Sequence, residues 1–249
     1  MEITYKPSPN FVKGRQGYNP ITIVIHIMEG TLSGTDSWFA SPKSQVSAHY
    51  GVGTNGEVHR YVLETDVAWH AGRVNDPTWK LIKTGGNGYV INPNLYTIGI
   101  EHEGDEYSEW TDEMYASSSS LIADISQRWG IPLDRDHIIG HHEIYSIKAC
   151  PGQKVDFDHL IMLATNKVAP VQAVPGYAAT PLKGQVRTIC PLHIRKTPDR
   201  TIDPIGRVEA NTMLSYTGYT NDGENVASCS KWYQTGAGTW FWAGGVIMP

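Results

Sequence analysis

The first two thirds of the chain carry short runs of alternating hydrophobic and polar residues, interspersed with segments of helical periodicity. Residues 21–27 are rich in β-branched side chains and form a run short enough for a buried strand. Isoleucine occupies its odd-numbered positions, so the even-numbered positions, which end at His26, share the opposite face. Residues 97–102 repeat this pattern, with isoleucine at 98 and 100 and Glu101 on the other face. Both runs therefore predict strands that end in a chemically reactive side chain.

Further runs complete an alternation of strands and helices. Residues 46–52 and 58–62 flank a Thr-Asn-Gly turn and predict a hairpin. A helix is expected over 111–130, because acidic residues favour its first turn and a glycine favours its end. A short strand at 138–139 and a helix at 157–164 follow. Strands interleaved with helices indicate an α/β fold.

The composition changes near residue 168. Residues 168–182 are rich in proline and small residues, which is typical of a semi-extended linker. We therefore expect a domain over 1–167, a linker over 168–182 and a second domain over 183–249. The last part contains only short β-like pieces separated by glycine, asparagine, aspartate and proline, which predicts a small all-β barrel.

Composition and charge limit the kinds of partner that the chain is expected to bind. The chain has 249 residues, 40% hydrophobic and 18% charged, as in globular proteins. A net charge of −5 without a basic cluster argues against a nucleic-acid partner. No apolar run approaches the roughly 18 residues of a membrane span, so we expect no membrane insertion. Three cysteines are too few for a disulfide framework, although Cys190 and Cys229 could pair in an oxidising compartment.

A metal site is the sharpest chemical hypothesis. His26 ends a predicted strand, His141 follows the strand at 138–139, and Cys150 lies nine residues later. Zinc binds imidazole nitrogen and thiolate sulfur, and catalytic sites use three protein ligands and leave one position for water. His142 is the alternative to His141. Taken singly, His26 also fits a hydrogen-bonded core histidine, and Cys150 a small buried hydrophobe.

Six short motifs occur in order along residues 15–160: Val24–His26, Ser47–Tyr50 with Gly56, Ala68–Gly72, Thr97–Glu101, Gly140–Glu143 and Lys148–Gly152. In this order they resemble the zinc-dependent N-acetylmuramoyl-L-alanine amidases shared by phage endolysins, bacterial recycling enzymes and animal peptidoglycan-recognition proteins. The resemblance implies a mixed central sheet flanked by helices.

The resemblance also implies roles for individual residues. It assigns His26, His141 and Cys150 to Zn²⁺, Glu101 to the general base and Lys148 to stabilisation of the oxyanion. Carboxylates at 103, 105 and 106 compete with Glu101 for its role. His49, Trp69 and His70 are the expected substrate-binding residues. Ala48 stands where some members carry a catalytic tyrosine, which leaves that role to Glu101.

Residues 183–249 resemble bacterial SH3-like cell-wall-targeting domains. The resemblance rests on 192–195, 231–234 and 240–246, the last two of which are rich in aromatic residues. It implies that Tyr233, Trp240 and Trp242 bind the wall, because aromatic rings offer flat apolar area at low entropy cost. The alternative is that these rings build the core of the barrel.

Together these features predict a peptidoglycan hydrolase. It would use a zinc-activated water to cleave the amide between N-acetylmuramic acid and L-alanine of the stem peptide. The N-terminus has no signal-peptide pattern, so we expect a phage endolysin made in the host cytoplasm that acts on the cell wall. The alternatives are a bacterial autolysin, a non-catalytic peptidoglycan-binding receptor of the same fold, and an unrelated zinc amidohydrolase.

Overall fold

The computed structural model describes residues 2–167, 177–201, 204–236 and 238–248. The chain divides into two compact units, residues 1–123 with 133–167 and residues 124–132 with 168–249. Of the expected linker, residues 168–176 lie outside the described residues, and strand β9 (Thr180–Thr188) begins within its last part. No helix among the described residues combines the length and apolar character needed to cross a bilayer.

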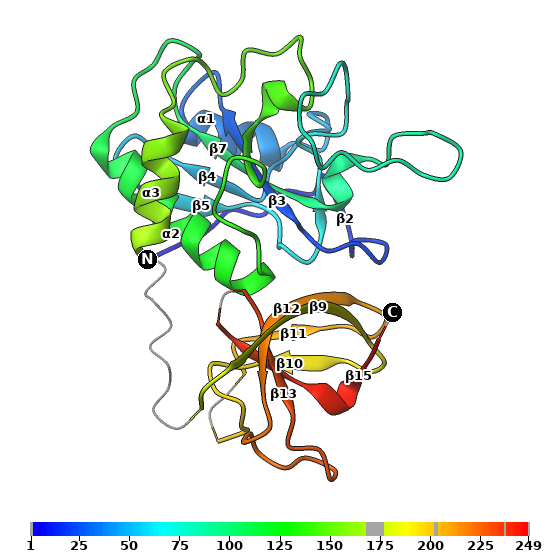
Figure 1. The fold of residues 1–249 in the computed structure, drawn as a ribbon. Coiled ribbons are helices and arrows are strands. Elements are labelled where there is room, and N and C mark those ends of the chain that lie inside the picture. The colour runs from blue at the N-terminus through cyan, green and yellow to red at the C-terminus, as the bar shows by residue number, and fades with distance from the viewer. Residues whose placement is uncertain (1, 168–176, 202–203, 237, 249) are drawn as a thin grey trace. The chain divides into compact units, whose positions relative to one another are not determined.

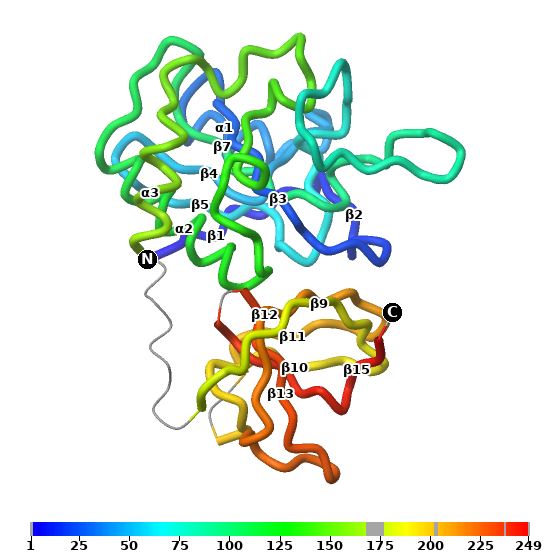
Figure 2. Tube along the Cα trace, in the orientation of Figure 1, coloured from blue at the N-terminus to red at the C-terminus, as the bar shows by residue number. Residues whose placement is uncertain are grey.

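A six-stranded mixed sheet forms the centre of the first unit (Figure 1). Strand β3 pairs in parallel with both β7 and β8, β7 pairs in parallel with β4, and β4 and β5 form the predicted antiparallel hairpin. Strand β1 pairs with β5 at one edge (Figure 2). The α/β class and the mixed sheet are thus confirmed. In sheet order the strands are β1 (Thr4–Tyr5), β5 (Val58–Arg60), β4 (Tyr50–Val52), β7 (Thr97–His102), β3 (Thr22–Ile27) and β8 (Ile138–Gly140).

Every residue of β3 is buried, which is typical of a parallel strand that is covered on both faces. Smaller elements complete the unit: the antiparallel pair β2 (Phe11–Val12) and β6 (Val67–Ala68), and the 3₁₀ helices η1 (Pro93–Leu95) and η2 (His141–Glu143).

Helix α2 (Asp112–Trp129) begins and ends where the sequence predicts. The Thr111 hydroxyl accepts a hydrogen bond from the Met114 amide (3.1 Å), and Gly130 has the positive φ of 68° that ends many helices. Helix α3 (Phe157–Lys167) lies against α2: its preceding Asp156 amide donates to the Tyr115 hydroxyl (2.8 Å). The predicted helix at 157–164 is therefore confirmed and extends to Lys167.

Helix α1 (Leu32–Ala40) was not expected from the sequence. Its serine, glycine, threonine and aspartate residues are poor helix formers. Thr31 caps it by accepting from the Gly34 amide (3.1 Å), and Leu32, Thr35 and Phe39 are buried at helical spacing. Burial and the cap therefore outweigh intrinsic propensity here.

The second unit is rich in β-structure. A five-stranded antiparallel sheet has the order β14 (Trp240–Trp242), β13 (Trp232–Gln234), β12 (Met213–Thr220), β9 and β15 (Val246–Ile247). Strands β10 (Leu192–Ile194) and β11 (Gly206–Val208) form a separate pair, and η3 (Ala243–Gly245) precedes β15. Cys190 and Cys229 are free thiols, as is Cys150.

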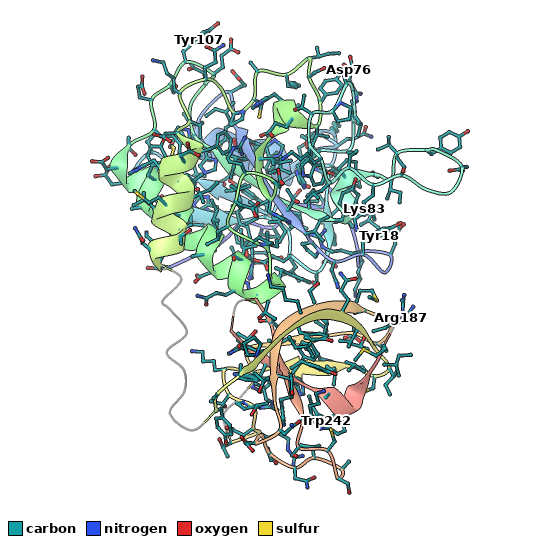
Figure 3. All side chains as sticks on the ribbon, viewed as in Figure 1. Tyr18, Asp76, Lys83, Tyr107, Arg187 and Trp242 are labelled. Carbon is teal, nitrogen blue, oxygen red and sulfur yellow. The ribbon has the colours of Figure 1, made fainter. Side chains whose placement is uncertain are left out.

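Two of the three aromatic residues expected to bind the wall are core residues. Tyr233 is 5% exposed and packs with Phe241, and Trp240 is 2% exposed. Trp242, labelled in Figure 3, lies at the end of β14 and is half-buried. Its indole N–H donates to the Cys229 carbonyl (3.0 Å). Tyr233 shares one buried cluster with aliphatic residues such as Leu192 and Ile194, so its ring fills the interior of the unit.

We expect Leu121→Ala to destabilise the protein by about 2–5 kcal/mol, because Leu121 of α2 is fully buried and its truncation leaves a cavity. The matched control is Asp124→Ala on the exposed side of the same helix, expected within about 0.5 kcal/mol of wild type. Urea denaturation measures both. Equal effects of the two variants would contradict this assignment of the buried face.

Candidate metal centre

Three parallel strands deliver reactive side chains to one edge of the sheet. Strand register pairs His26 of β3 with Glu101 of β7, and Ile25 of β3 with Gly140 of β8. His141 follows Gly140 directly, so it emerges beside the end of β3. Because the carboxyl ends of parallel strands meet at the same edge, this is where α/β proteins commonly bind ligands.

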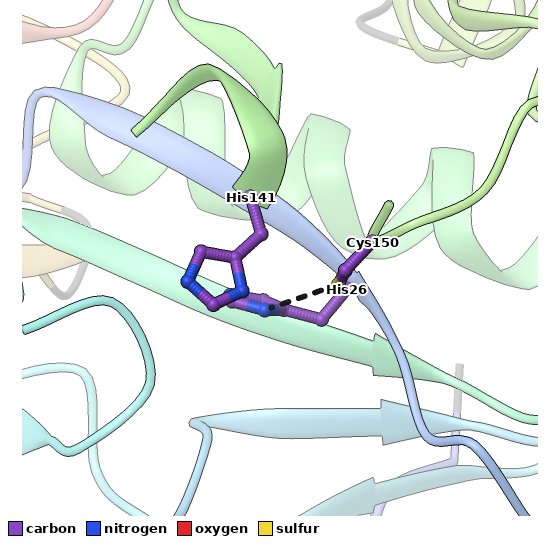
Figure 4. Close-up of side chains that lie close together, drawn as sticks. All are labelled: His26, His141 and Cys150. Atoms are coloured by element: carbon purple, nitrogen blue, oxygen red, sulfur yellow. Dashed lines mark hydrogen bonds between the residues drawn. The ribbon is translucent and has the colours of Figure 1, made fainter. Parts of the chain in front are cut away.

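His26, His141 and Cys150 form a group that can hold a metal ion, with ligand atoms all within 4.8 Å of one another (Figure 4). Nδ1 of His26 lies 3.7 Å from Sγ of Cys150, and the rings of His26 and His141 have centroids 4.6 Å apart. The amide of Ile27 donates to Sγ of Cys150 (3.3 Å), a contact that favours the thiolate. The ligand atoms of the three residues therefore converge closely enough to meet at one ion.

His141, not His142, joins this group. The backbone amide of His142 and its Nδ1 both contact the Cys150 carbonyl, at 2.9 and 3.0 Å. Its ring also lies over Gly140, where a Cβ would come within 2.5 Å of the imidazole. His142 thus fastens the Cys150 segment to the end of β8 and does not contribute a ligand atom to the group.

The two predicted catalytic residues face the same cleft. Oε2 of Glu101 is buried and has no hydrogen-bond partner within the described part of the chain. Burial raises the pKa of Glu101 to about 8; the positive charge of Lys148 opposes this rise, and the negative charge of Glu29 adds to it. Lys148 is exposed and lines the same cleft.

A cleft of about 560 Å³ surrounds the group. Trp69 and His70, both expected to bind substrate, line it. Trp38, which is 58% exposed on α1, and the carboxylates Glu29 and Glu106 also line the cleft, although the sequence did not point to them. Only an expectation of helix α1 would have pointed to Trp38.

His49 does not reach the cleft. It is fully buried, with Nδ1 accepting from the Gly99 amide (3.0 Å) and Nε2 lying 2.8 Å from the Arg15 guanidinium. Arg15 is itself buried and donates to the carbonyls of Glu64 and Thr97. His49 therefore belongs to the framework that holds β7, and its predicted contact with substrate finds no support in the geometry.

Burial keeps the imidazoles of the cluster neutral. It lowers the pKa values of His26 and His70 well below their usual range, and that of His141 to about 4, where Lys148 and His142 add to the effect. Burial and Glu101 raise the pKa of the Cys150 thiol. A metal ion would thus meet unprotonated imidazole nitrogens and would have to displace the proton of the thiol.

A comparison with known proteins shows to which family the chain belongs. Residues 16–153, more than half of the chain, match the family described as N-acetylmuramoyl-L-alanine amidase. The chain belongs to this family. Every residue of the metal-binding group, together with Glu101 and Lys148, lies within the matched segment.

Two relatives of the chain have names that agree with this family. The chain is 35% identical over 112 residues to N-acetylmuramoyl-L-alanine amidase A of Achromobacter lyticus, covering 44% of this chain and 52% of the relative. It is 32% identical over 118 residues to 1,6-anhydro-N-acetylmuramyl-L-alanine amidase AmpD of Haemophilus influenzae, covering 47% and 58%. The chain spans about half the length of these curated relatives.

A solved structure extends the comparison to the fold of this amidase-family chain. A selenomethionine derivative of AmpD superposes with a TM-score of 0.52 at 26% identity, over 65% of this chain and 94% of that one.

We expect the metal-free protein to lose stability as the pH falls from 7.5 to 5. The pKa values of His26, His49 and His70 lie below the value near 6.5 of the unfolded chain, so acid protonates the unfolded state first. Each such histidine costs up to about 1.4 kcal/mol per pH unit below that value. Glu101, whose pKa is raised, acts in the opposite direction but is a single group.

Urea denaturation in the presence of a chelator measures the free energy of unfolding at both pH values. An equal or larger free energy at pH 5 would contradict the neutral, buried state of these imidazoles.

Proposed function

We propose that this chain is a zinc-dependent N-acetylmuramoyl-L-alanine amidase that cleaves the amide between N-acetylmuramic acid and L-alanine of peptidoglycan stem peptides. One observation carries the proposal: two imidazoles and a thiol converge beside a buried carboxylate, Glu101, whose Oε2 has no hydrogen-bond partner among the described residues. Family membership and the names of the relatives support the choice of bond.

The donor set fits zinc. Nitrogen and sulfur ligands suit Zn²⁺ and not Mg²⁺ or Ca²⁺, which prefer oxygen. With bonds of ~2.1 Å to nitrogen and ~2.3 Å to sulfur at a tetrahedral angle, the two atoms would lie about 3.6 Å apart. Nδ1 of His26 and Sγ of Cys150 lie 3.7 Å apart. Three protein ligands also leave one position for water, as in catalytic zinc sites.

The chain's own residues supply the proton transfer. When bound, zinc would polarise the attacking water and the amide carbonyl. Glu101 accepts the proton of the water and delivers it to the departing nitrogen of L-alanine. Burial raises the pKa of Glu101 to about 8 in the metal-free protein, and a bound divalent cation would favour the carboxylate form that a general base needs.

Lys148 and the cleft walls complete the proposed mechanism. The ammonium of Lys148, at the rim, stabilises the negative charge that develops on the carbonyl oxygen. Trp69 and Trp38 offer aromatic faces to the muramyl-peptide. The alternative function, a receptor that binds peptidoglycan without cleaving it, has no use for a complete set of zinc ligands, and this favours the enzyme.

We further propose that the second unit is an SH3-like domain that binds the cell wall. Its antiparallel sheet and the half-buried Trp242 support this role, whereas Tyr233 and Trp240 contribute to its core. Action as a phage endolysin stays a prediction.

We expect Cys150→Ala to lose zinc and hydrolysis together, because it removes one of three ligands. Glu101→Gln should keep zinc but lower kcat by about 10²–10⁴, the range typical of a lost general base. Cys229→Ala, a free thiol of the second unit, is the matched control and should change neither. Metal analysis and mass spectrometry of digested walls, scored for new N-terminal alanine, measure the outcomes.

New reducing sugar ends instead of N-terminal alanine would contradict the proposed bond. Full activity of Cys150→Ala would contradict the metal centre, and a change in Glu101→Gln confined to KM would contradict the general base.

We expect Trp242→Ala to reduce pelleting with purified walls while leaving hydrolysis of a soluble muramyl-peptide unchanged, because Trp242 lies outside the catalytic cleft. Trp242→Phe keeps an aromatic face and should retain most of the pelleting. If pelleting is unaffected by Trp242→Ala, the wall is bound elsewhere.

A further inference from the structure

A series of polar contacts runs from His26 away from Cys150. Nε2 of His26 lies 3.0 Å from Nδ1 of His70, and Nε2 of His70 lies 3.2 Å from the hydroxyl of Thr97. That hydroxyl donates to the Pro93 carbonyl (2.8 Å). The series therefore links a predicted metal ligand, through a second histidine, to the backbone before β7.

The carbonyl at the end of the series determines where the protons lie. A carbonyl only accepts, so the single hydroxyl proton of Thr97 points to Pro93. The Thr97 oxygen is then an acceptor, and Nε2 of His70 must carry the proton that it receives. A neutral imidazole has one ring proton, so Nδ1 of His70 has a lone pair.

The same reasoning continues to His26. The lone pair on Nδ1 of His70 accepts a proton from Nε2 of His26, which leaves Nδ1 of His26 unprotonated. That atom is the one that faces Sγ of Cys150. The hydrogen bond to the Pro93 carbonyl thus fixes the protons along the whole series and leaves a lone pair on Nδ1 of His26 that a metal can bind.

We propose that His70 and Thr97 are positioning residues that hold His26 in the tautomer with Nε2 protonated, so that Nδ1 is ready for the metal. This inference rests on the metal centre proposed above. Hydrogen bonds behind a ligating histidine commonly fix its tautomer and ring orientation in this way.

The surroundings of His70 hold its ring in place. A Cβ at Gly99 of β7 would lie 2.5 Å from Nδ1 of His70, so only glycine leaves room for the imidazole against the strand. Oδ1 of the buried Asn94 accepts from the amides of His70 and Ala71, at 3.2 and 2.7 Å. Backbone and ring are therefore both fixed.

This role differs from the one expected from the sequence. His70 lines the cleft, but both of its ring nitrogens are engaged within the protein. Neither nitrogen is left to hydrogen-bond a substrate, so His70 acts through His26.

The test compares Thr97→Val with Thr97→Ser in the full chain. Valine removes the acceptor for His70, and serine keeps it. We expect Thr97→Val to raise the zinc Kd about 10- to 100-fold, measured by competition with a chromophoric chelator, and Thr97→Ser to stay close to wild type. Nitrogen-15 NMR of the metal-free protein should show His26 protonated at Nε2 in wild type and a mixture of tautomers in Thr97→Val.

A second pair of variants keeps the test decisive if Thr97→Val fails to fold. His70→Asn keeps an acceptor near the position of Nδ1 and should bind zinc more tightly than His70→Leu. Equal zinc affinity of Thr97→Val, His70→Leu and wild type would overturn the proposal, as would a wild-type His26 protonated at Nδ1. A wild-type chain that binds no zinc contradicts the metal centre instead, while the nitrogen spectra still decide the proton arrangement.

Discussion

The parallel register of β3 with β7 and β8 is the constraint on which the cleft depends. It sets His26 beside Glu101 and brings His141 out at the end of β3. Because side chains alternate along a strand, a slip of one residue would send His26 to the opposite face of the sheet. Burial of every residue of β3 opposes such a slip, since a shifted strand would have to repack all of its side chains.

Glycine residues, which have no side chain, are as important to this architecture as the side chains of the cleft. Three glycines, Gly51, Gly99 and Gly140, lie on strands of the central sheet, and a Cβ at any of them would meet a neighbour within 2.7 Å. At Gly99 and Gly140 the neighbours are the imidazoles of His70 and His142, which hold His26 and Cys150 respectively. Glycine in a strand commonly marks a close approach, and here it admits the rings that support the metal-binding group.

Burial determines which groups in the cleft carry a charge. It keeps the imidazoles neutral, the thiol protonated and the pKa of Glu101 near 8, so the metal-free cluster carries little charge. A divalent cation would reverse this balance by favouring the thiolate and the carboxylate. The uncharged imidazole nitrogens are therefore available to a cation, and Lys148 lines the same cleft.

Strong periodicity made much of this architecture predictable from sequence. The isoleucine alternation of β3 and β7, the capped α2 and the glycine turn between β4 and β5 all match the structure. Helix α1 did not, because tertiary burial overrides its poor propensity. For His49, Tyr233 and Trp240 residue type alone could not separate framework from surface, since aromatic and imidazole rings serve both. The sequence could not separate His142 from His141 as a ligand, because adjacent histidines share one sequence context. The structure separates them, since it places His142 against the Cys150 carbonyl.

The most direct test of the metal centre is X-ray absorption at the zinc edge of the purified chain. We expect one zinc per chain with two imidazole nitrogens, one sulfur at about 2.3 Å and one oxygen in its shell. A shell without sulfur, or a chain that stays free of zinc when zinc is supplied, would contradict it.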